Sequence, residues 1–160
     1  MDARSFYLPP RFALALAPMQ VVQLLGGPDG RREMLRCALR ALHPAGLLAV
    51  AIADPFEAVP AAESLPPLPD VREEHGWVLS SRPLAVRAEP GAVVIERLRQ
   101  AVSPSGEIDE ELSTVRLESV STEALEREAL ESGLRPTGRR QVPPTRDHVG
   151  STVALLERAR

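Results

Sequence analysis

Apolar residues in the first third of the chain form two short unbroken runs with a periodic segment between them. The runs are "FALALA" at Phe12–Ala17 and "LLAVAIA" at Leu47–Ala53. A short unbroken apolar run is typical of a strand that is covered on both faces, as in a parallel sheet. We therefore expect two buried strands.

The segment between these runs has the spacing of a helix. From Asp29 to His43 the apolar side chains recur three and four positions apart, at Leu35, Ala38, Leu39 and Leu42. This pattern predicts an amphipathic helix with one buried stripe, which Pro44 cannot continue. Strand, crossover helix and strand in this order make a βαβ unit and favour a parallel sheet.

Beyond residue 54 the pattern changes twice. Residues 55–76 are rich in Pro and acidic residues and have no period, which indicates a long loop. Residues 77–120 contain three β-rich segments with partial alternation, "WVLSSRPLAVRAE", "AVVIERLRQAV" and "LSTVRLESV". Partial alternation favours an antiparallel meander.

The last part, residues 121–160, predicts a helix followed by a hairpin. The helix "STEALEREALESG" has Ser121 or Thr122 as its N-cap, and Gly133 lies just past its C-terminus. The two final segments, around the turn "RDHVG", indicate an antiparallel hairpin at the sheet edge.

These elements predict one α/β domain over 1–160. It consists of a βαβ part at 1–54, a Pro-rich loop at 55–76, a β-rich insertion at 77–120, and the last helix with the hairpin at 121–160. A chain of 160 residues has the volume for a single core.

Composition excludes several classes of protein. The net charge is −3 and the basic residues are spread out, so the chain lacks the basic patch of a nucleic-acid binder. No stretch reaches the roughly 18 apolar residues of a membrane helix. The lone Cys37 excludes an internal disulfide and fits a reducing compartment. We expect a cytoplasmic protein without a membrane or nucleic-acid partner.

Four segments, in this order along the chain, resemble a known family. They are "DARSF" at 2–6, "FALALAPMQ" at 12–20, "LHPAGLLAVAI" at 42–52 and "ESGL" at 131–134. Together they resemble the C-terminal half of a class I S-adenosylmethionine (SAM)-dependent methyltransferase of small-molecule type. The resemblance implies a partial Rossmann-like sheet with an inserted antiparallel meander, SAM as the cofactor, and a small-molecule methyl acceptor.

The resemblance also implies cofactor contacts at Asp2, Ala3, Pro18, Met19, Gln20 and Gln23. The first two would line the adenine pocket. Pro18, Met19 and Gln20 would lie at the sulfonium end, and both glutamines would reach SAM or the substrate. In the alternative interpretation, Gln20 and Gln23 hydrogen-bond the loop backbone.

Two histidines are candidate bases that would deprotonate the acceptor. His75 opens the β-rich insertion, and His148 lies beside Asp147, which would fix its tautomer. The alternative for each is an ordinary loop histidine. Three widely separated histidines and one cysteine show no metal-ligand spacing.

The glycine-rich SAM-binding turn of the family is absent, because the sequence contains no Gly-x-Gly. Nor does the sequence before Phe12 have room for two strands and two helices. We therefore expect a truncated methyltransferase whose chain alone binds SAM weakly or not at all and is inactive by itself. Methyl transfer depends mostly on alignment, and the missing turn would provide its anchor.

A non-catalytic role is the alternative. A methyltransferase-like chain that lacks strands has an exposed sheet edge, and such an edge promotes association. The chain would then form a homodimer or pair with a full-length homologue.

Overall fold

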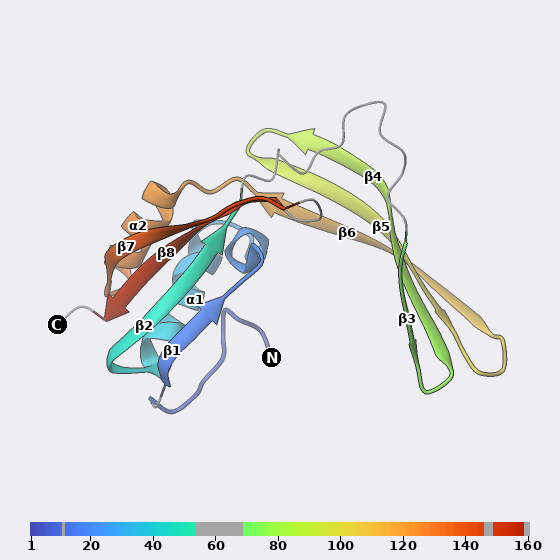
Figure 1. Ribbon diagram of the computed structural model, residues 1–160, viewed down its shortest axis with the longest axis horizontal. Coiled ribbons are helices and arrows are strands. Elements are labelled where there is room, and N and C mark those ends of the chain that lie inside the picture. The colour runs from blue at the N-terminus through green and yellow to red at the C-terminus, as the bar shows by residue number, and fades with distance from the viewer. Residues whose placement is uncertain (11, 54–68, 146–148, 159–160) are drawn as a thin grey trace. The chain divides into compact units, whose positions relative to one another are not determined.

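The computed structural model describes residues 1–10, 12–53, 69–145 and 149–158 (Figure 1). The chain divides into two compact units. Unit 1 comprises Met1–Glu57 and Glu118–Arg160, and unit 2 comprises Ala58–Leu117. Each unit is described by itself.

The described residues of unit 1 form a four-stranded sheet, two α-helices and one 3-10 helix. Its elements are β1 (Phe12–Ala17), η1 (Val21–Leu24), α1 (Pro28–Ala41), β2 (Leu42–Ile52), α2 (Thr122–Glu131), β7 (Leu134–Val142) and β8 (Ser151–Arg158). The strand order is β1-β2-β8-β7, in which β1 is parallel to β2 and the other neighbours are antiparallel. The predicted βαβ unit and the C-terminal hairpin are therefore confirmed. The hairpin adds β8 next to β2 and leaves β7 at the edge.

The boundary between α1 and β2 differs from the sequence prediction. The helix ends at Ala41, and β2 begins at Leu42. The segment "HPAG" at 43–46, which contains the Pro44 expected to end the helix, therefore lies within the strand. The first residue of β2, Leu42, pairs with Phe12 at the start of β1. On β2 the parallel pairing therefore begins ahead of the apolar run that starts at Leu47.

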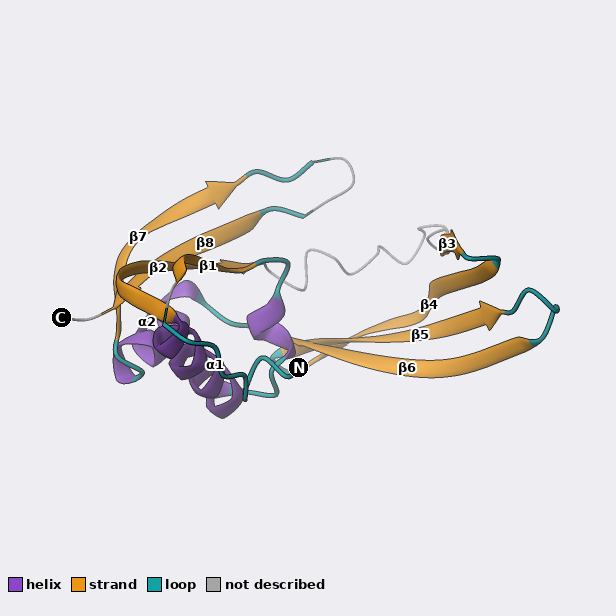
Figure 2. Ribbon diagram, turned by 90° about the horizontal axis from the view of Figure 1, so that it is seen from below, coloured by secondary structure: helices purple, strands orange, loops and turns teal. Residues whose placement is uncertain are grey.

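The sheet of unit 1 is covered by α1 and α2 on one face (Figure 2). Along β2, Leu48, Val50 and Ile52 are buried, whereas the residues between them are partly exposed. On β1 the side chains of Leu14 and Leu16 are 51% and 66% exposed. The prediction that β1 is covered on both faces is wrong, because the two described α-helices pack on the same side of the sheet.

The core of unit 1 lies between this sheet face and the helices. Leu35 of α1, Leu125 of α2 and Leu134 of β7 are fully buried in it. The predicted N-cap is confirmed, since the Ser121 hydroxyl accepts a hydrogen bond from the Ala124 N–H at 3.1 Å.

Unit 2 is an antiparallel sheet with the strand order β3-β4-β5-β6. Its strands are β3 (Asp70–Glu74), β4 (Trp77–Glu89), β5 (Ala92–Val102) and β6 (Ile108–Glu118), whose last residue belongs to unit 1. The predicted antiparallel meander is confirmed. Of the loop expected over 55–76, residues 55–68 lie outside the described residues. Residues 70–74 form β3 instead of a loop.

A buried ion network ties α1 to α2 and to the end of β6. Arg31 Nε and Nη2 each donate to the Glu128 carboxylate at 2.8 Å, and Arg31 Nη1 donates to Glu118 Oε2 at 2.9 Å. The Arg31 side chain is only 7% exposed. Its hydrogen bonds to Glu128 raise the pKa of the guanidinium, which therefore stays charged although it is buried.

Candidate functional site

A cavity of about 510 Å³ lies at the end of the unit 1 sheet where β1 and β2 terminate. It is lined by Met19, Gln20, Ala51, Ala53, Val142, Val149 and Ser151. Because β1 and β2 are parallel, their carboxyl ends meet at one edge of the sheet. Open α/β sheets bind their ligands at this edge.

The loop after β1 has an unusual backbone where it lines the cavity. Met19 and Gln20 have φ values of 51° and 65°, in the left-handed region that non-glycine residues rarely adopt. The Met19 side chain is 83% exposed. Strained backbone of this kind concentrates at functional sites, which makes this loop a candidate ligand contact.

The cavity lining is mostly apolar, with two polar side chains. The amide of Gln20 and the hydroxyl of Ser151 are the polar groups, among small apolar residues such as Ala51 and Ala53. A pocket of this size and chemistry fits part of a small ligand, with few polar groups to fix its orientation. Sequence reasoning missed Ser151, the first residue of β8, although the central place of β8 next to β2 explains its position.

The predicted adenine contacts, Asp2 and Ala3, are not among the residues that line this cavity. The Asp2 carboxylate accepts hydrogen bonds from the Arg4 backbone N–H at 2.8 Å and from Arg4 Nη2 at 2.7 Å. The side-chain bond from Arg4 is the main cause that lowers the pKa of Asp2 to about 2. Ala3 is partly buried and packs against the core of unit 1.

The two predicted glutamines have different surroundings. Gln20 lines the cavity, whereas Gln23 is fully buried. The Gln23 amide donates to the carbonyls of Ala53 and Glu118 at 3.0 and 2.8 Å and accepts from the Ala53 N–H at 3.1 Å. Gln23 therefore hydrogen-bonds backbone groups, but these lie just after β2 and at the end of β6, and not in its own loop as the alternative interpretation had it.

Of the two predicted bases, His75 lies in unit 2 and His148 lies outside the described residues. His75 and Gly76 form a two-residue turn between β3 and β4, with φ values of 52° and 79°. Its side chain is 88% exposed, and Nδ1 lies 4.0 Å from Glu74 Oε1.

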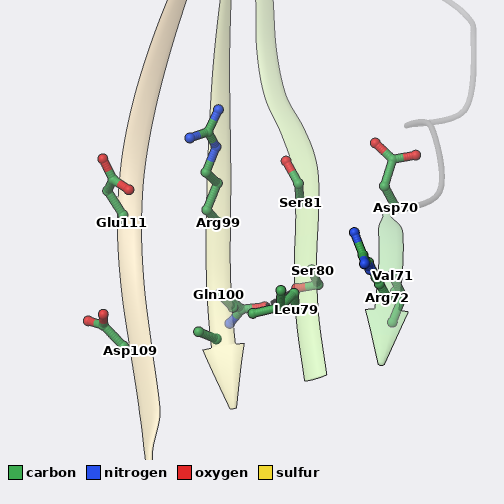
Figure 3. Close-up of a pocket in the computed structure, with 11 residues that line it drawn as sticks. Asp70, Val71, Arg72, Leu79, Ser80, Ser81, Arg99, Gln100, Asp109 and Glu111 are labelled. Atoms are coloured by element: carbon green, nitrogen blue, oxygen red, sulfur yellow. Dashed lines mark hydrogen bonds between the residues drawn. The ribbon is translucent and has the colours of Figure 1, made fainter. Parts of the chain in front are cut away.

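Unit 2 has a cavity of its own, of about 410 Å³, lined by residues of all four of its described strands (Figure 3). Its lining combines apolar and uncharged polar residues with charged residues of both signs, which are Arg72, Arg99, Asp70, Asp109 and Glu111. Within residues 1–10, 12–53, 69–145 and 149–158, we found no group of acidic, histidine or cysteine side chains that could hold a metal ion. The described helices include none long and apolar enough to cross a membrane.

No family model and no curated protein matches this chain. Several solved structures, however, are similar to it in fold. A SAM-dependent methyltransferase from Clostridium acetobutylicum ATCC 824 superposes with a TM-score of 0.67 at 8% identity, over 100% of this chain and 63% of that one. DesVI from Streptomyces venezuelae has a TM-score of 0.66 at 17% identity, over 96% of this chain and 62% of its own.

The sugar N-methyltransferase KedS8 from Streptoalloteichus sp ATCC 53650 has a TM-score of 0.66 at 16% identity, over 100% of this chain and 61% of its own. The chain thus spans less than two thirds of the length of these neighbours. It has the fold of the corresponding part of SAM-dependent methyltransferases.

Proposed function

We propose that this chain takes part in SAM-dependent methyl transfer to a small-molecule acceptor. The observation that supports this most is the cavity at the carboxyl ends of β1 and β2, with the strained Met19–Gln20 loop on its rim. The solved neighbours of the same fold are named SAM-dependent methyltransferases, and one of them is named a sugar N-methyltransferase.

In this proposal Pro18, Met19 and Gln20 bind the methionine portion of the cofactor around its sulfonium. The Gln20 amide oxygen is a suitable neighbour for a positively charged sulfur, and Ala51 and Ala53 leave space beside it. Asp2 and Ala3 are the proposed adenine contacts. Small apolar residues with one or two polar groups suit a group that must be oriented rather than held by charge.

SAM supplies an already activated methyl group, so the protein has to align the acceptor and accept its proton. The acceptor atom forms a bond to the methyl carbon while the carbon–sulfur bond breaks, and the electron pair stays on sulfur. We propose His75 and His148 as candidate bases for the proton that the acceptor loses. Alignment of the reacting atoms provides most of the rate enhancement in such a reaction.

The test is a nuclear magnetic resonance titration of the ¹⁵N-labelled chain with S-adenosylhomocysteine, the product form of the cofactor. We expect amide shift changes at Met19 and Gln20 that do not saturate at millimolar ligand. The variant Gln20→Gly removes the side chain while tolerating the positive φ, and it should abolish most of these changes. Gln100→Ala in unit 2 is the control and should leave them intact. Equal changes in the wild type and in Gln20→Gly would contradict the proposed role of Gln20.

A second candidate function is non-catalytic pairing with another chain, which the exposure of β1 favours. Within the described residues β1 pairs only with β2, and Leu14 and Leu16 are exposed beside its open edge. Open edges and exposed apolar patches promote association.

If pairing is the function, the chain should dimerise in analytical ultracentrifugation, and Leu16→Glu should shift it to monomer. Leu130→Glu is the matched control, because Leu130 on α2 is 58% exposed away from the sheet. A wild-type chain that stays monomeric over the whole accessible concentration range would exclude self-pairing.

A further inference from the structure

The cavity of unit 2 has no role in the proposed methyl transfer, because none of its lining residues is a proposed cofactor contact or a candidate base. The strand register places Asp70, Ser81 and Arg99 directly opposite one another on β3, β4 and β5. Side chains at directly paired positions lie on the same face of a sheet. Figure 3 shows these three residues in one row across the strands, with Glu111 of β6 at its end.

Two of the charged groups at this cavity already have partners in unit 2. Arg97 Nη2 donates to Asp70 Oδ2 at 2.9 Å, and Arg97 Nε donates to the Ser81 hydroxyl at 2.9 Å. Arg72 Nη2 lies 2.9 Å from Glu74 Oε2. The charges of Asp70 and Arg72 are therefore balanced by neighbouring side chains.

The other charged groups of the lining are Arg99, Asp109 and Glu111, and all three residues are exposed. Across the part of the chain that the structure describes, no hydrogen bond or ion pair engages their side chains. Elsewhere on the same sheet opposite charges are paired, as for Arg87 Nη2 and Glu96 Oε1 at 2.8 Å. The cavity therefore offers one guanidinium and two carboxylates to a ligand.

We propose that the cavity of unit 2 binds a small zwitterion that carries a carboxylate and a protonated amine. The Arg99 guanidinium binds the ligand's carboxylate through two charge-assisted hydrogen bonds. Asp109 and Glu111, two positions apart on β6, share the amine, which has three N–H donors. Leu79 and Ala101, a directly paired apolar couple in the lining, contact the methylene groups between the ligand's charged ends.

The mixed charge of the free groups selects a ligand with both charges. A simple amine leaves the Arg99 guanidinium without a partner, and a simple carboxylate is repelled by Asp109 and Glu111. Because these side chains are exposed to water, binding is weak and is screened by salt. The inference does not rest on methyl transfer, so either proposal can fail without the other.

The test is a titration of the ¹⁵N-labelled chain at low ionic strength with three probes of matched length: γ-aminobutyrate, butyrate and butylamine. We expect γ-aminobutyrate to shift the amides of Arg99, Asp109 and Glu111 with saturation. Each single-charge probe should bind about 10-fold more weakly, because it lacks one charged hydrogen-bonding group. Equal affinity for γ-aminobutyrate and either single-charge probe, or no shift changes at these residues with γ-aminobutyrate, would overturn the inference.

Two variants then assign the contacts. Arg99→Gln and Glu111→Gln each remove one charge and keep a polar side chain, and each should weaken γ-aminobutyrate binding about 10-fold. Both positions are exposed, so the substitutions remove no core packing. Arg87→Gln on β4 is the matched control, since it changes the net charge as Arg99→Gln does but lies outside the cavity lining. Wild-type affinity in Arg99→Gln, or an equal loss in Arg87→Gln, would overturn the inference.

Discussion

Replacing Arg31 by methionine is expected to lower the free energy of unfolding of unit 1 by about 3–5 kcal/mol. The Arg31 and Glu128 side chains are 7% and 9% exposed, so the substitution leaves a buried carboxylate without its partner. It also removes the bond to Glu118. Urea denaturation followed by circular dichroism at a helix band reports unit 1, because both α-helices belong to it.

The neighbouring arginine provides the control. Arg32 also binds α2, through Glu131, but Glu131 is 56% exposed and the other partner, Asp29, is 96% exposed. Arg32→Met should therefore cost at most about 1 kcal/mol. The double variant Arg31→Met with Glu128→Met should recover much of the loss, since it removes the unpaired charge. Equal losses for Arg31→Met and Arg32→Met would contradict the buried network.

The second large effect is expected at Leu48, in the middle of β2. Leu48 is 2% exposed and faces the helices, so Leu48→Ala should cost about 2–5 kcal/mol. Leu47 precedes it on the same strand, points to the opposite face and is only partly buried. Leu47→Ala should cost at most about 1 kcal/mol, because less apolar area returns to water.

This pair tests whether the sheet of unit 1 is covered on one face, since both variants delete the same atoms from adjacent positions. The same denaturation experiment measures both. Leu16→Ala on β1, where the side chain is 66% exposed, should have almost no effect. Similar losses at Leu47 and Leu48 would mean that both faces are packed, which is incompatible with the described arrangement.

The sequence predicted the position and direction of strands β1 and β2 better than it predicted which of their faces are buried. The run "FALALA" forms β1 over the predicted residues, and the crossover helix makes it parallel to β2. An apolar run does not reveal, however, whether the chain itself covers both faces. Burial depends on which side of the sheet α1 and α2 pack, and local periodicity holds no information about that.

Strand β3 was missed because its residues, "DVREE", are charged and do not alternate. It forms by pairing with β4 across the turn at His75 and Gly76. Both turn residues have positive φ, as a tight two-residue hairpin turn requires. One signal was available in the sequence, since Gly76 directly before a β-rich segment is a residue type that a two-residue hairpin turn favours.

The candidate site was predictable only in part, for a related reason. Met19 and Gln20 follow β1 directly, so their place at the end of the strand follows from the local sequence. The hydrogen-bond partners of Gln23 do not follow from the local sequence, because one of them, Glu118, is 95 positions away along the chain. Ser151 enters the cavity lining only because β8 inserts next to β2.

The central claim is that the cofactor's sulfur end binds where β1 and β2 terminate. The most direct measurement is the residue-by-residue map of amide shift changes when the ¹⁵N-labelled chain is titrated with S-adenosylhomocysteine. We predict that the changes cluster at Met19, Gln20, Ala53 and Ser151, around the cavity of unit 1. Changes confined to the unit 2 cavity near Arg99 and Glu111, or changes spread evenly along the chain, would contradict the claim.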